Sequence, residues 1–203
     1  MRVVVVGASG NVGTSVLHAL GADDSVESIV GIARRKPAMA WPKTEWIEAD
    51  VTSDDLVPHL RGADCVVHLA WAIQPSRDEA TLYATNVEGS QHVFNSAVRA
   101  GVPALVYASS IGAYSPGPKD DAGVDESWPT EGIATSFYSR HKAAVERLLD
   151  SLEREHPEMR VVRLRPGLIF KREAATEIRR YFGGPFIPSP LVQRRLIPIV
   201  PRV

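Results

Sequence analysis

The feature that most constrains the fold is an alternation of short apolar runs with stretches of helical character. The apolar runs are Arg2–Val6, Ser28–Ala33, Thr44–Glu48, Cys65–Leu69, Ala104–Ala108 and Arg160–Arg165. The helical stretches are Val12–Leu20, Asp54–Leu60, Glu79–Ala100, Phe137–Glu155 and Glu173–Phe182. Strands that alternate with helices in this way form βαβ units and a parallel sheet buried on both faces. The sequence therefore predicts an α/β fold with a doubly wound parallel sheet of order 3-2-1-4-5-6 and helices on both faces.

A glycine-rich turn, Gly7-Ala-Ser-Gly-Asn-Val-Gly13, joins the first expected strand to the first expected helix. In such a turn the first glycine permits the tight bend, the second lets backbone approach a pyrophosphate, and the third lets helix and strand pack closely. The N-terminus of the following helix offers N–H groups and a partial positive charge to an anion. Because a strand precedes the turn and a helix follows it, a dinucleotide site on a Rossmann fold is favoured over an ordinary turn.

Two arginines follow the second expected strand, where a site for NAD usually places an acid that binds the ribose 2′-hydroxyl. Arg34 and Arg35 can instead pair with a 2′-phosphate, and the alternative is a solvated basic loop. Asp50 follows the third expected strand, where its carboxylate could accept the adenine amino group or cap the next helix. The sequence therefore predicts NADP as the cofactor, with NAD less favoured.

Tyr138 and Lys142 lie at the start of an expected helix, and their i, i+4 spacing puts both side chains on one face. A lysine ammonium near a phenol favours the phenolate, which makes the tyrosine a usable general acid or base at a substrate oxygen. Ser110 comes just after the fifth expected strand, at the sheet edge where ligands bind in open α/β sheets. These three residues predict hydride transfer between a nicotinamide and an alcohol or carbonyl carbon.

Seven motifs occur in the order typical of one family across residues 1–167. They are Gly7–Gly13, Asp50-Val51, His68-Leu-Ala70, Asn86-Val-Glu-Gly89, Ser109-Ser110, Tyr138–Lys142 and Arg165-Pro-Gly167. The chain resembles the extended branch of the short-chain dehydrogenase/reductase superfamily, the NAD-dependent epimerase/dehydratase group. It departs from the family pattern after the serines, where Gly112-Ala-Tyr-Ser115 replaces the usual Val-Tyr-Gly, and after Pro166, where Gly167-Leu-Ile-Phe-Lys171 replaces Asn-Val-Tyr-Gly-Pro.

The resemblance implies a role for each of the three candidate catalytic residues. It implies that Tyr138 is the acid/base, that Lys142 holds the nicotinamide ribose and tunes Tyr138, and that Ser110 orients the substrate. Ser110 takes this role rather than Ser109 because it lies four residues before Tyr114, as the family's catalytic Ser or Thr lies before its Val-Tyr-Gly.

The resemblance also extends the candidate cofactor site beyond the glycine turn and the arginines. It implies that Ala70 and Trp71 flank the cofactor, that Asn86 supports the active-site helix, and that Pro166 and Gly167 border the nicotinamide. The full set of expected cofactor-binding residues is Gly7, Ser9, Gly10, Asn11, Val12, Gly13, Arg34, Arg35, Asp50, Val51, Leu69, Ala70, Trp71, Asn86, Ser109, Tyr138, Lys142, Pro166 and Gly167.

Two stretches interrupt the alternation. Residues 112–136 carry three prolines and four glycines and predict a long loop after the fifth strand, a kind of loop that usually has a functional role. Residues 183–203 carry five prolines and predict an extended segment. Extended members of the family have a substrate-binding domain beyond this point. We therefore expect residues 1–182 to form the NAD(P)-binding Rossmann domain, and residues 183–203 to start a substrate-binding region that the chain does not contain.

Composition and charge disfavour several other classes of function. A formal net charge of −1 gives no general attraction to nucleic acid or to an anionic membrane, and no apolar run approaches the ~20 residues of a membrane span. A single cysteine excludes an internal disulfide and a cysteine-based zinc site, and we expect no metal. A cytoplasmic location and a homodimer are further expectations.

These observations together predict an NADP-preferring oxidoreductase or epimerase that acts on a small alcohol, a carbonyl compound or a nucleotide sugar. The alternative is a non-catalytic NADP-binding redox sensor or scaffold, which would need the glycine turn but not Ser110, Tyr138 and Lys142. Two histidines near these motifs are interpreted as inert. We expect His141 to be solvated on the helix surface and His68 to be bonded to backbone groups.

Overall fold

The computed structural model describes residues 1–38, 40–73, 78–120 and 122–171, and divides the chain into two units, Met1–Ile169 and Phe170–Val203. The first unit contains a six-stranded sheet whose pairs are all parallel, in the order β3-β2-β1-β4-β5-β6. Its strands are β1 (Arg2–Val6), β2 (Ser28–Ala33), β3 (Thr44–Glu48), β4 (Cys65–His68), β5 (Ala104–Ala108) and β6 (Arg160–Leu164). The predicted fold class and strand order are confirmed, and β4 and β6 each end one residue earlier than predicted.

The helices of the first unit follow the predicted positions with two differences. They are α1 (Asn11–Ala22), α2 (Val57–Leu60), α3 (Glu79–Tyr83), a π-helical stretch (Ala84–Glu88), α4 (Gly89–Arg99), a 3-10 turn (Ile111–Ala113) and α5 (Phe137–Glu155). The predicted helix Asp54–Leu60 is shortened to α2, because the Asp54 carboxylate accepts the Asp50 N–H and holds residues 50–54 in a turn. The predicted helix Glu79–Ala100 is one helical run that the π-helical stretch divides. The predicted helix Glu173–Phe182 and the boundary at residue 182 lie outside the described residues.

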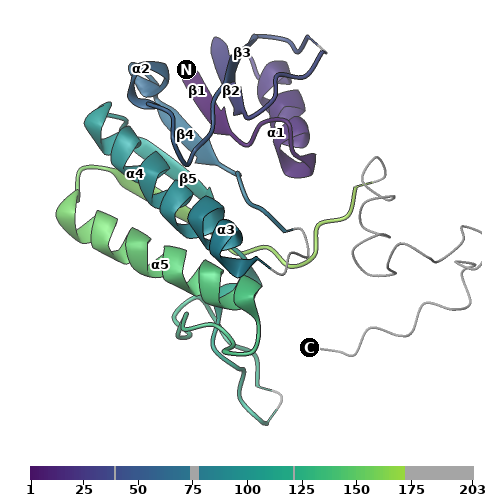
Figure 1. The fold of residues 1–203 in the computed structure, drawn as a ribbon, viewed down its shortest axis with the longest axis vertical. Coiled ribbons are helices and arrows are strands. Elements are labelled where there is room, and N and C mark those ends of the chain that lie inside the picture. Colours follow the sequence, from purple (N-terminus) through teal and green to yellow (C-terminus); the bar gives the residue numbers. More distant parts are fainter. Residues whose placement is uncertain (39, 74–77, 121, 172–203) are drawn as a thin grey trace, which may run out of the picture. The chain divides into compact units, whose positions relative to one another are not determined.

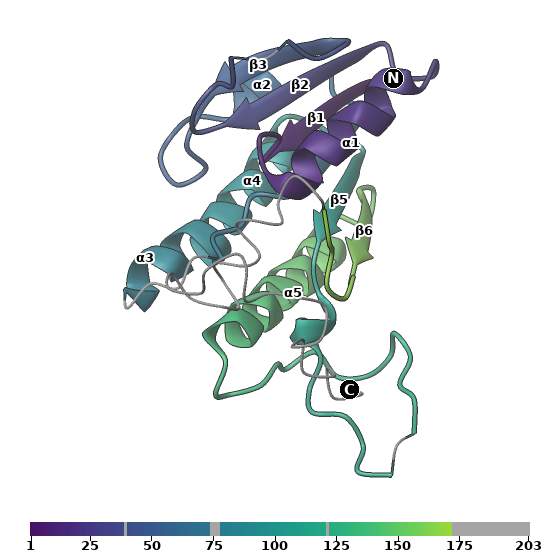
Figure 2. The same ribbon diagram turned by 90° about the vertical axis from the view of Figure 1, so that its right-hand side faces the viewer.

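The sheet is covered on both faces, as Figures 1 and 2 show. Alternate residues of a strand point to opposite faces, so Val4 and Val6 of β1 pack with α4 and α5, whereas Val3 and Val5 pack with Leu17 of α1. Helix α1 contacts β1 and β2, while α4 and α5 lie side by side on the other face. This winding brings the carboxyl ends of all the strands to one edge, where the site forms.

The predicted long loop lies between the 3-10 turn and α5. A backbone hydrogen bond from Gly132 N–H to the Ala113 carbonyl (3.0 Å) ties it to the 3-10 turn, and one from Ser115 N–H to the Pro129 carbonyl (2.8 Å) joins two parts of the loop itself. Ser139 at the start of α5 donates to the Gly112 carbonyl (2.5 Å) and accepts from Ile133 N–H (2.6 Å). Both ends of the loop are therefore fixed beside the start of α5.

Candidate active site

The three glycines of the first turn have different structural roles. Gly7 has φ +85°, and a Cβ there would lie 2.5 Å from the Ala70 nitrogen, so a side chain would collide with the segment after β4. A Cβ on Gly13 would lie 2.4 Å from the Gly7 carbonyl oxygen, whereas one on Gly10 would meet only that oxygen, at 3.3 Å. The outer glycines thus allow close packing of strand, turn and helix, and Gly10 faces open space.

Helix α1 begins directly after Gly10, and its N-terminus is chemically suited to an anion. No side chain caps this end, and the first turn contains no acidic residue. The N–H groups at a helix N-terminus carry a partial positive charge that favours phosphate groups. Asn11, Val12 and Gly13 form the first turn of α1, as the glycine motif predicted.

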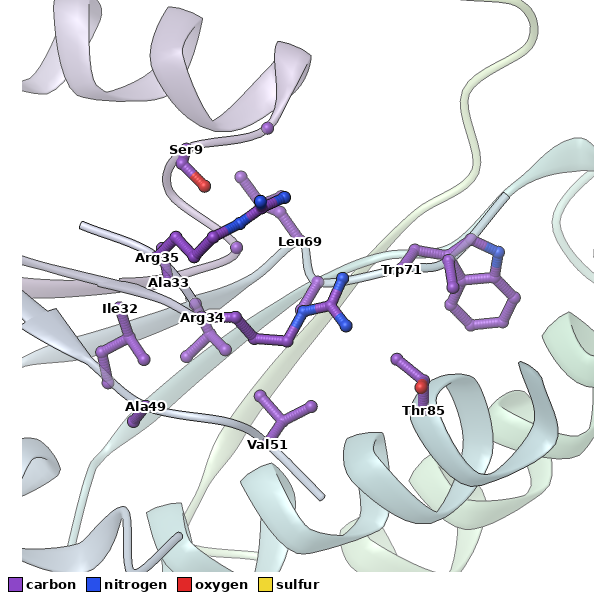
Figure 3. Close-up of a pocket in the computed structure, with 15 residues that line it drawn as sticks. Ser9, Ile32, Ala33, Arg34, Arg35, Ala49, Val51, Leu69, Trp71 and Thr85 are labelled. Atoms are coloured by element: carbon purple, nitrogen blue, oxygen red, sulfur yellow. The ribbon is translucent and has the colours of Figure 1, made fainter. Parts of the chain in front are cut away.

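A cavity of about 240 Å³ opens beside the glycine turn. Figure 3 shows Arg34 and Arg35 extending over it from the end of β2, with Ser9 on one side and Val51 on the other. Several residues that the sequence predicted to bind the cofactor line this cavity: Gly7, Ser9, Gly10, Arg34, Arg35, Val51, Leu69, Ala70 and Trp71. The lining residues that sequence reasoning missed are Val6, Ile32, Ala33, Ala49, Ala72 and Thr85.

The two arginines and Asp50 differ in what they already bind. Arg34 and Arg35 are exposed, and neither guanidinium has a hydrogen-bond or ion-pair partner within the described part of the chain. Asp50 instead accepts hydrogen bonds from the N–H (2.9 Å) and hydroxyl (2.7 Å) of Thr52, and these bonds hold the pKa of Asp50 below its usual value. Asp50 does not cap α2, whose N-cap is Leu56, so the capping alternative is wrong.

Lys142 projects from α5 into a buried position between β5 and the segment after β4. Its ammonium donates to the Ala108 carbonyl (2.7 Å) and the Tyr107 hydroxyl (3.3 Å), and lies 3.5 Å from the centre of the Trp71 ring. Burial lowers the pKa of Lys142 to about 7, although the negative charge of Glu146 acts in the opposite direction. Lys142 is therefore a lysine whose charge can change near neutral pH.

Tyr138 and Ser110 meet around the backbone of Gly112. A Cβ on Gly112 would lie 3.0 Å from Cε1 of Tyr138 and 3.4 Å from Oγ of Ser110, so both side chains border the same small space. The Lys142 ammonium lies 5.9 Å from the centre of the Tyr138 ring, and Trp71 contacts that ring edge-on. The structure thus brings the three predicted catalytic residues together at the carboxyl edge of the sheet.

Two further predicted residues are buried and bind protein groups. Asn86 accepts from the N–H of Ala72 (2.7 Å) and donates to its carbonyl (3.0 Å), and so fixes the segment after β4 that carries Trp71. Ser109 donates its hydroxyl to Glu146 of α5 (2.5 Å). Pro166 accepts the N–H of Ile111 (3.1 Å), which places the segment after β6 against the one after β5.

Glu146 is a residue that sequence reasoning missed. Its carboxylate is fully buried and accepts hydrogen bonds from Ser109, Arg163 and Arg165. Burial raises the pKa of Glu146, but these three hydrogen-bond partners outweigh burial and keep the pKa below its usual value. The available signal was its position four residues after Lys142 on the same helix face.

The predicted surroundings of the two histidines are wrong. His141 is buried, not solvated, because its ring packs edge-on against Tyr83 and Phe137, and its Nε2 lies 3.6 Å from a carboxylate oxygen of Glu79. His68 is bonded to a side chain and not to the backbone, since its Nε2 lies 2.9 Å from the hydroxyl of Ser90. Burial, helped by the charge of Lys142, lowers the pKa of His68 to about 3 and keeps this ring neutral.

Comparison with known proteins identifies the family of the chain. Residues 3–177 match the sequence model of the NAD dependent epimerase/dehydratase family. The chain belongs to this family. It is 33% identical over 110 residues to the L-arabinose 1-dehydrogenase (NAD(P)+) of Haloferax volcanii, and the matched region covers 54% of this chain and 41% of the relative. It is 32% identical over 132 residues to the decarboxylating sterol-4-alpha-carboxylate 3-dehydrogenase of Candida albicans, which covers 63% of the chain and 37% of the relative.

Solved structures share the same fold. A UDP-glucuronic acid 4-epimerase from Bacillus cereus in complex with NAD superposes with a TM-score of 0.71 at 21% identity, over 84% of the chain and 57% of the epimerase. A short-chain dehydrogenase/reductase superfamily protein from Agrobacterium tumefaciens with bound NAD gives a TM-score of 0.69 at 26% identity, over 81% of this chain and 48% of that protein. The chain therefore spans about two fifths of the two curated relatives and about half of these two solved chains.

Two kinds of feature are absent from the described residues. No helix among them has the length and hydropathy to cross a membrane. Within the same residues no group of three or more His, Cys, Asp or Glu side chains is arranged to hold a metal ion.

Proposed function

We propose that the chain binds NADP(H) in the cavity beside the glycine turn and supports hydride transfer to or from an alcohol or carbonyl carbon. One observation carries this proposal: Ser110, Tyr138 and Lys142 gather at the same sheet edge as the cavity, and Trp71 joins the two. Trp71 lines the cavity while its ring contacts both Lys142 and Tyr138. Family membership and the NAD-bound solved neighbours support a nicotinamide dinucleotide in general, and the preference for NADP rests on Arg34 and Arg35 alone.

The residues of the cavity fit a dinucleotide. The open face of Gly10 and the uncapped N-terminus of α1 suit a pyrophosphate. Arg34 and Arg35 are exposed cations over the cavity, and no acid follows β2 to bind a ribose 2′-hydroxyl. Each charge-assisted hydrogen bond to a 2′-phosphate contributes on the order of 1.5–3 kcal/mol, so the arginines favour NADP over NAD.

The chain's own residues then divide the chemistry between them. A bound nicotinamide supplies or accepts the hydride. Tyr138 gives a proton to the substrate oxygen or takes one from it, and Ser110 donates a hydrogen bond that holds this oxygen in place. The Lys142 ammonium stabilises the tyrosinate electrostatically and holds the nicotinamide ribose through its hydroxyl groups.

The substrate itself is proposed only as a class. An acid/base tyrosine beside a nicotinamide can act on an alcohol or a carbonyl compound. Nucleotide sugars are included because several of the solved neighbours were solved in complex with, or are named for, UDP-sugars.

The test is a pair of variants assayed for hydride transfer with aldehydes, ketones and nucleotide sugars. Tyr138→Phe removes only the hydroxyl, so turnover should fall ~10²–10⁴-fold with NADPH affinity unchanged. Lys142→Ala should weaken NADPH binding and turnover together, and should move the remaining pH–rate profile to higher pH. Tyr83→Phe is the matched control, because Tyr83 is 43% exposed and contacts His141 through its ring alone.

The outcomes separate the enzyme from the redox sensor. Wild-type turnover by Tyr138→Phe would contradict the acid/base role. NADPH binding without turnover in any natural form of the protein would favour the sensor or scaffold.

A further inference from the structure

The carboxylate of Glu146 has no solvent-exposed surface and binds three side chains at once. Ser109 donates to Oε1 (2.5 Å), Arg165 donates to both oxygens (2.9 Å each), and Arg163 donates to Oε2 (3.0 Å). A buried carboxylate is tolerated only when it is paired and hydrogen-bonded in this way. The number and geometry of these bonds fix the position of every group that makes them.

The partners of Glu146 lie on different segments of the active-site edge. Ser109 directly follows β5 and precedes Ser110. Arg165 follows β6, directly precedes Pro166, and also donates to the Tyr114 hydroxyl (3.0 Å) and the Glu126 carbonyl (3.1 Å) of the long loop. One carboxylate on α5 therefore joins the end of β5, the long loop and the end of β6.

The same helix carries the two residues that these segments must face. Tyr138, Lys142 and Glu146 are spaced by four residues and follow one face of α5. Ser110 borders the space around Gly112 into which Tyr138 also points. Any displacement of the Ser109–Ser110 segment from α5 changes the distance between the Ser110 and Tyr138 hydroxyl groups.

We infer that Glu146 is a positioning residue, which holds Ser110 and the segment after β6 in register with Tyr138. The inference rests on the proposed function of Tyr138 and Ser110. Glu146 touches neither the cavity lining nor, on this proposal, the substrate, so it acts only through the residues it binds.

The titration midpoint of Lys142 is a measurement that would not change if Glu146 had only a structural role. The titratable groups that act on Lys142 are Tyr107 on β5, His68 on β4, and Tyr138 and Glu146 on α5. His68 is neutral over the usual pH range, so Glu146 supplies the negative charge that favours the ammonium. Neutralising Glu146 leaves Arg165 without a carboxylate partner, whereas Arg163 keeps Asp150 and Glu153, and the loss of the Glu146 charge moves the titration of Lys142 to lower pH.

The experiment compares Glu146→Gln and Ser109→Ala with Asp150→Asn. Asp150 is the matched control, because it also lies on α5 and accepts a hydrogen bond from Arg163 (2.6 Å). Unlike Glu146, it is exposed and forms no hydrogen bond with Ser109. The ionisation of Lys142 is followed in the free protein by ¹³Cε and ¹⁵Nζ NMR, and Lys142→Arg assigns its signal among the five lysines. NADPH affinity and kcat are measured on the same samples at pH 6, where Lys142 is protonated.

The expected results differ between the variants. Glu146→Gln should lower the midpoint of the Lys142 titration by on the order of one pH unit. It should also reduce kcat ~10–100-fold, as expected for a small misplacement, while NADPH affinity at pH 6 stays within ~2-fold. Ser109→Ala should reduce kcat with the Lys142 midpoint unchanged, Glu146→Asp should recover part of the loss, and Asp150→Asn should match wild type.

An unchanged kcat and Lys142 midpoint in folded Glu146→Gln would overturn the inference. If that variant does not fold, Ser109→Ala decides, and a wild-type kcat there would overturn the inference. A wild-type protein that binds no dinucleotide would contradict the proposed function, and the Lys142 titration in the free protein would still decide whether Glu146 controls that charge.

Discussion

At the β2 end of the site, Arg34 and Arg35 are exposed and form no hydrogen bond or ion pair with another described side chain, whereas at the α5 end Lys142 and Glu146 are buried and hydrogen-bonded to protein groups. The charge of Arg34 helps to lower the pKa of the nearby Asp50, but neither arginine forms an ion pair with a described carboxylate, so both suit a ligand that brings its own negative charge. The charges at the second end are balanced within the protein, so their geometry is set before any ligand arrives. Recognition of phosphate and preparation of the chemistry are thus separated along one sheet edge.

This contrast predicts that changes at the two ends fail in different ways. A change at the glycine turn or the arginines should appear in the affinity for the dinucleotide. A change at Tyr138 or Glu146 on α5 should appear in turnover, and a change at Lys142 should appear in turnover, in affinity and in the dependence of both on pH.

The largest expected effect is at the junction of β1 and α1. Gly13→Ala places a methyl group 2.4 Å from the Gly7 carbonyl oxygen and 2.6 Å from that of Ala8, and backbone atoms cannot turn aside as a flexible side chain can. We expect NADPH binding to be lost and the free energy of unfolding to fall by about 1–3 kcal/mol. Gly117→Ala is the control, because a Cβ there has no neighbour within 4 Å. Calorimetric titration and thermal unfolding of both variants check the prediction, and wild-type binding by Gly13→Ala would refute the role of this turn.

The second effect concerns the choice of cofactor. Arg34→Ala combined with Arg35→Ala should weaken NADPH ~10-fold or more and leave NADH nearly unchanged, since only NADPH carries the 2′-phosphate. Lys36→Ala is the control, because Lys36 is an adjacent exposed cation that does not line the cavity. Fluorescence titration with both cofactors measures the effect. Equal losses for NADPH and NADH would mean that the arginines bind no 2′-phosphate.

The two ends also differ in how far the sequence could predict them. The glycine turn is made by residues that are neighbours in sequence, so Gly7 to Gly13 could be placed from local pattern alone. The network of Glu146 could not be predicted, because its partners Ser109 and Arg165 follow strands β5 and β6 and are distant from Glu146 in sequence. His141 was misjudged for a related reason, since its burial depends on Tyr83 from another helix.

The sheet order was predictable because handedness and short connections leave few ways to wind six parallel strands. The turn at residues 50–54 was not, because side-chain hydrogen bonds by Asp50 and Asp54 replaced the expected start of a helix. Local pattern thus determined the elements, and long-range polar contacts determined the details of the site.

The third and smallest effect is a dependence of cofactor affinity on pH. The pKa of Lys142 is lowered by burial to about 7, so above pH 7 the free protein must take up a proton before an ammonium can hold the ribose. The Kd for NADPH should therefore rise as pH increases from 7, by at most ~10-fold per pH unit. Lys142→Arg stays charged and should remove this dependence. A wild-type Kd that is constant between pH 6 and pH 9 would contradict the assignment of Lys142 to the ribose.

Fluorescence titration of the wild-type chain with NADPH and NADH, at one pH and one ionic strength, tests the proposed dinucleotide site and its preference for a 2′-phosphate. Both cofactors should bind, competing for one site per chain, and NADPH should bind at least ~10-fold more tightly. Equal affinities would remove the role of Arg34 and Arg35 in recognising a 2′-phosphate. Failure of both cofactors to bind would contradict the proposal that the cavity beside the glycine turn is a dinucleotide site.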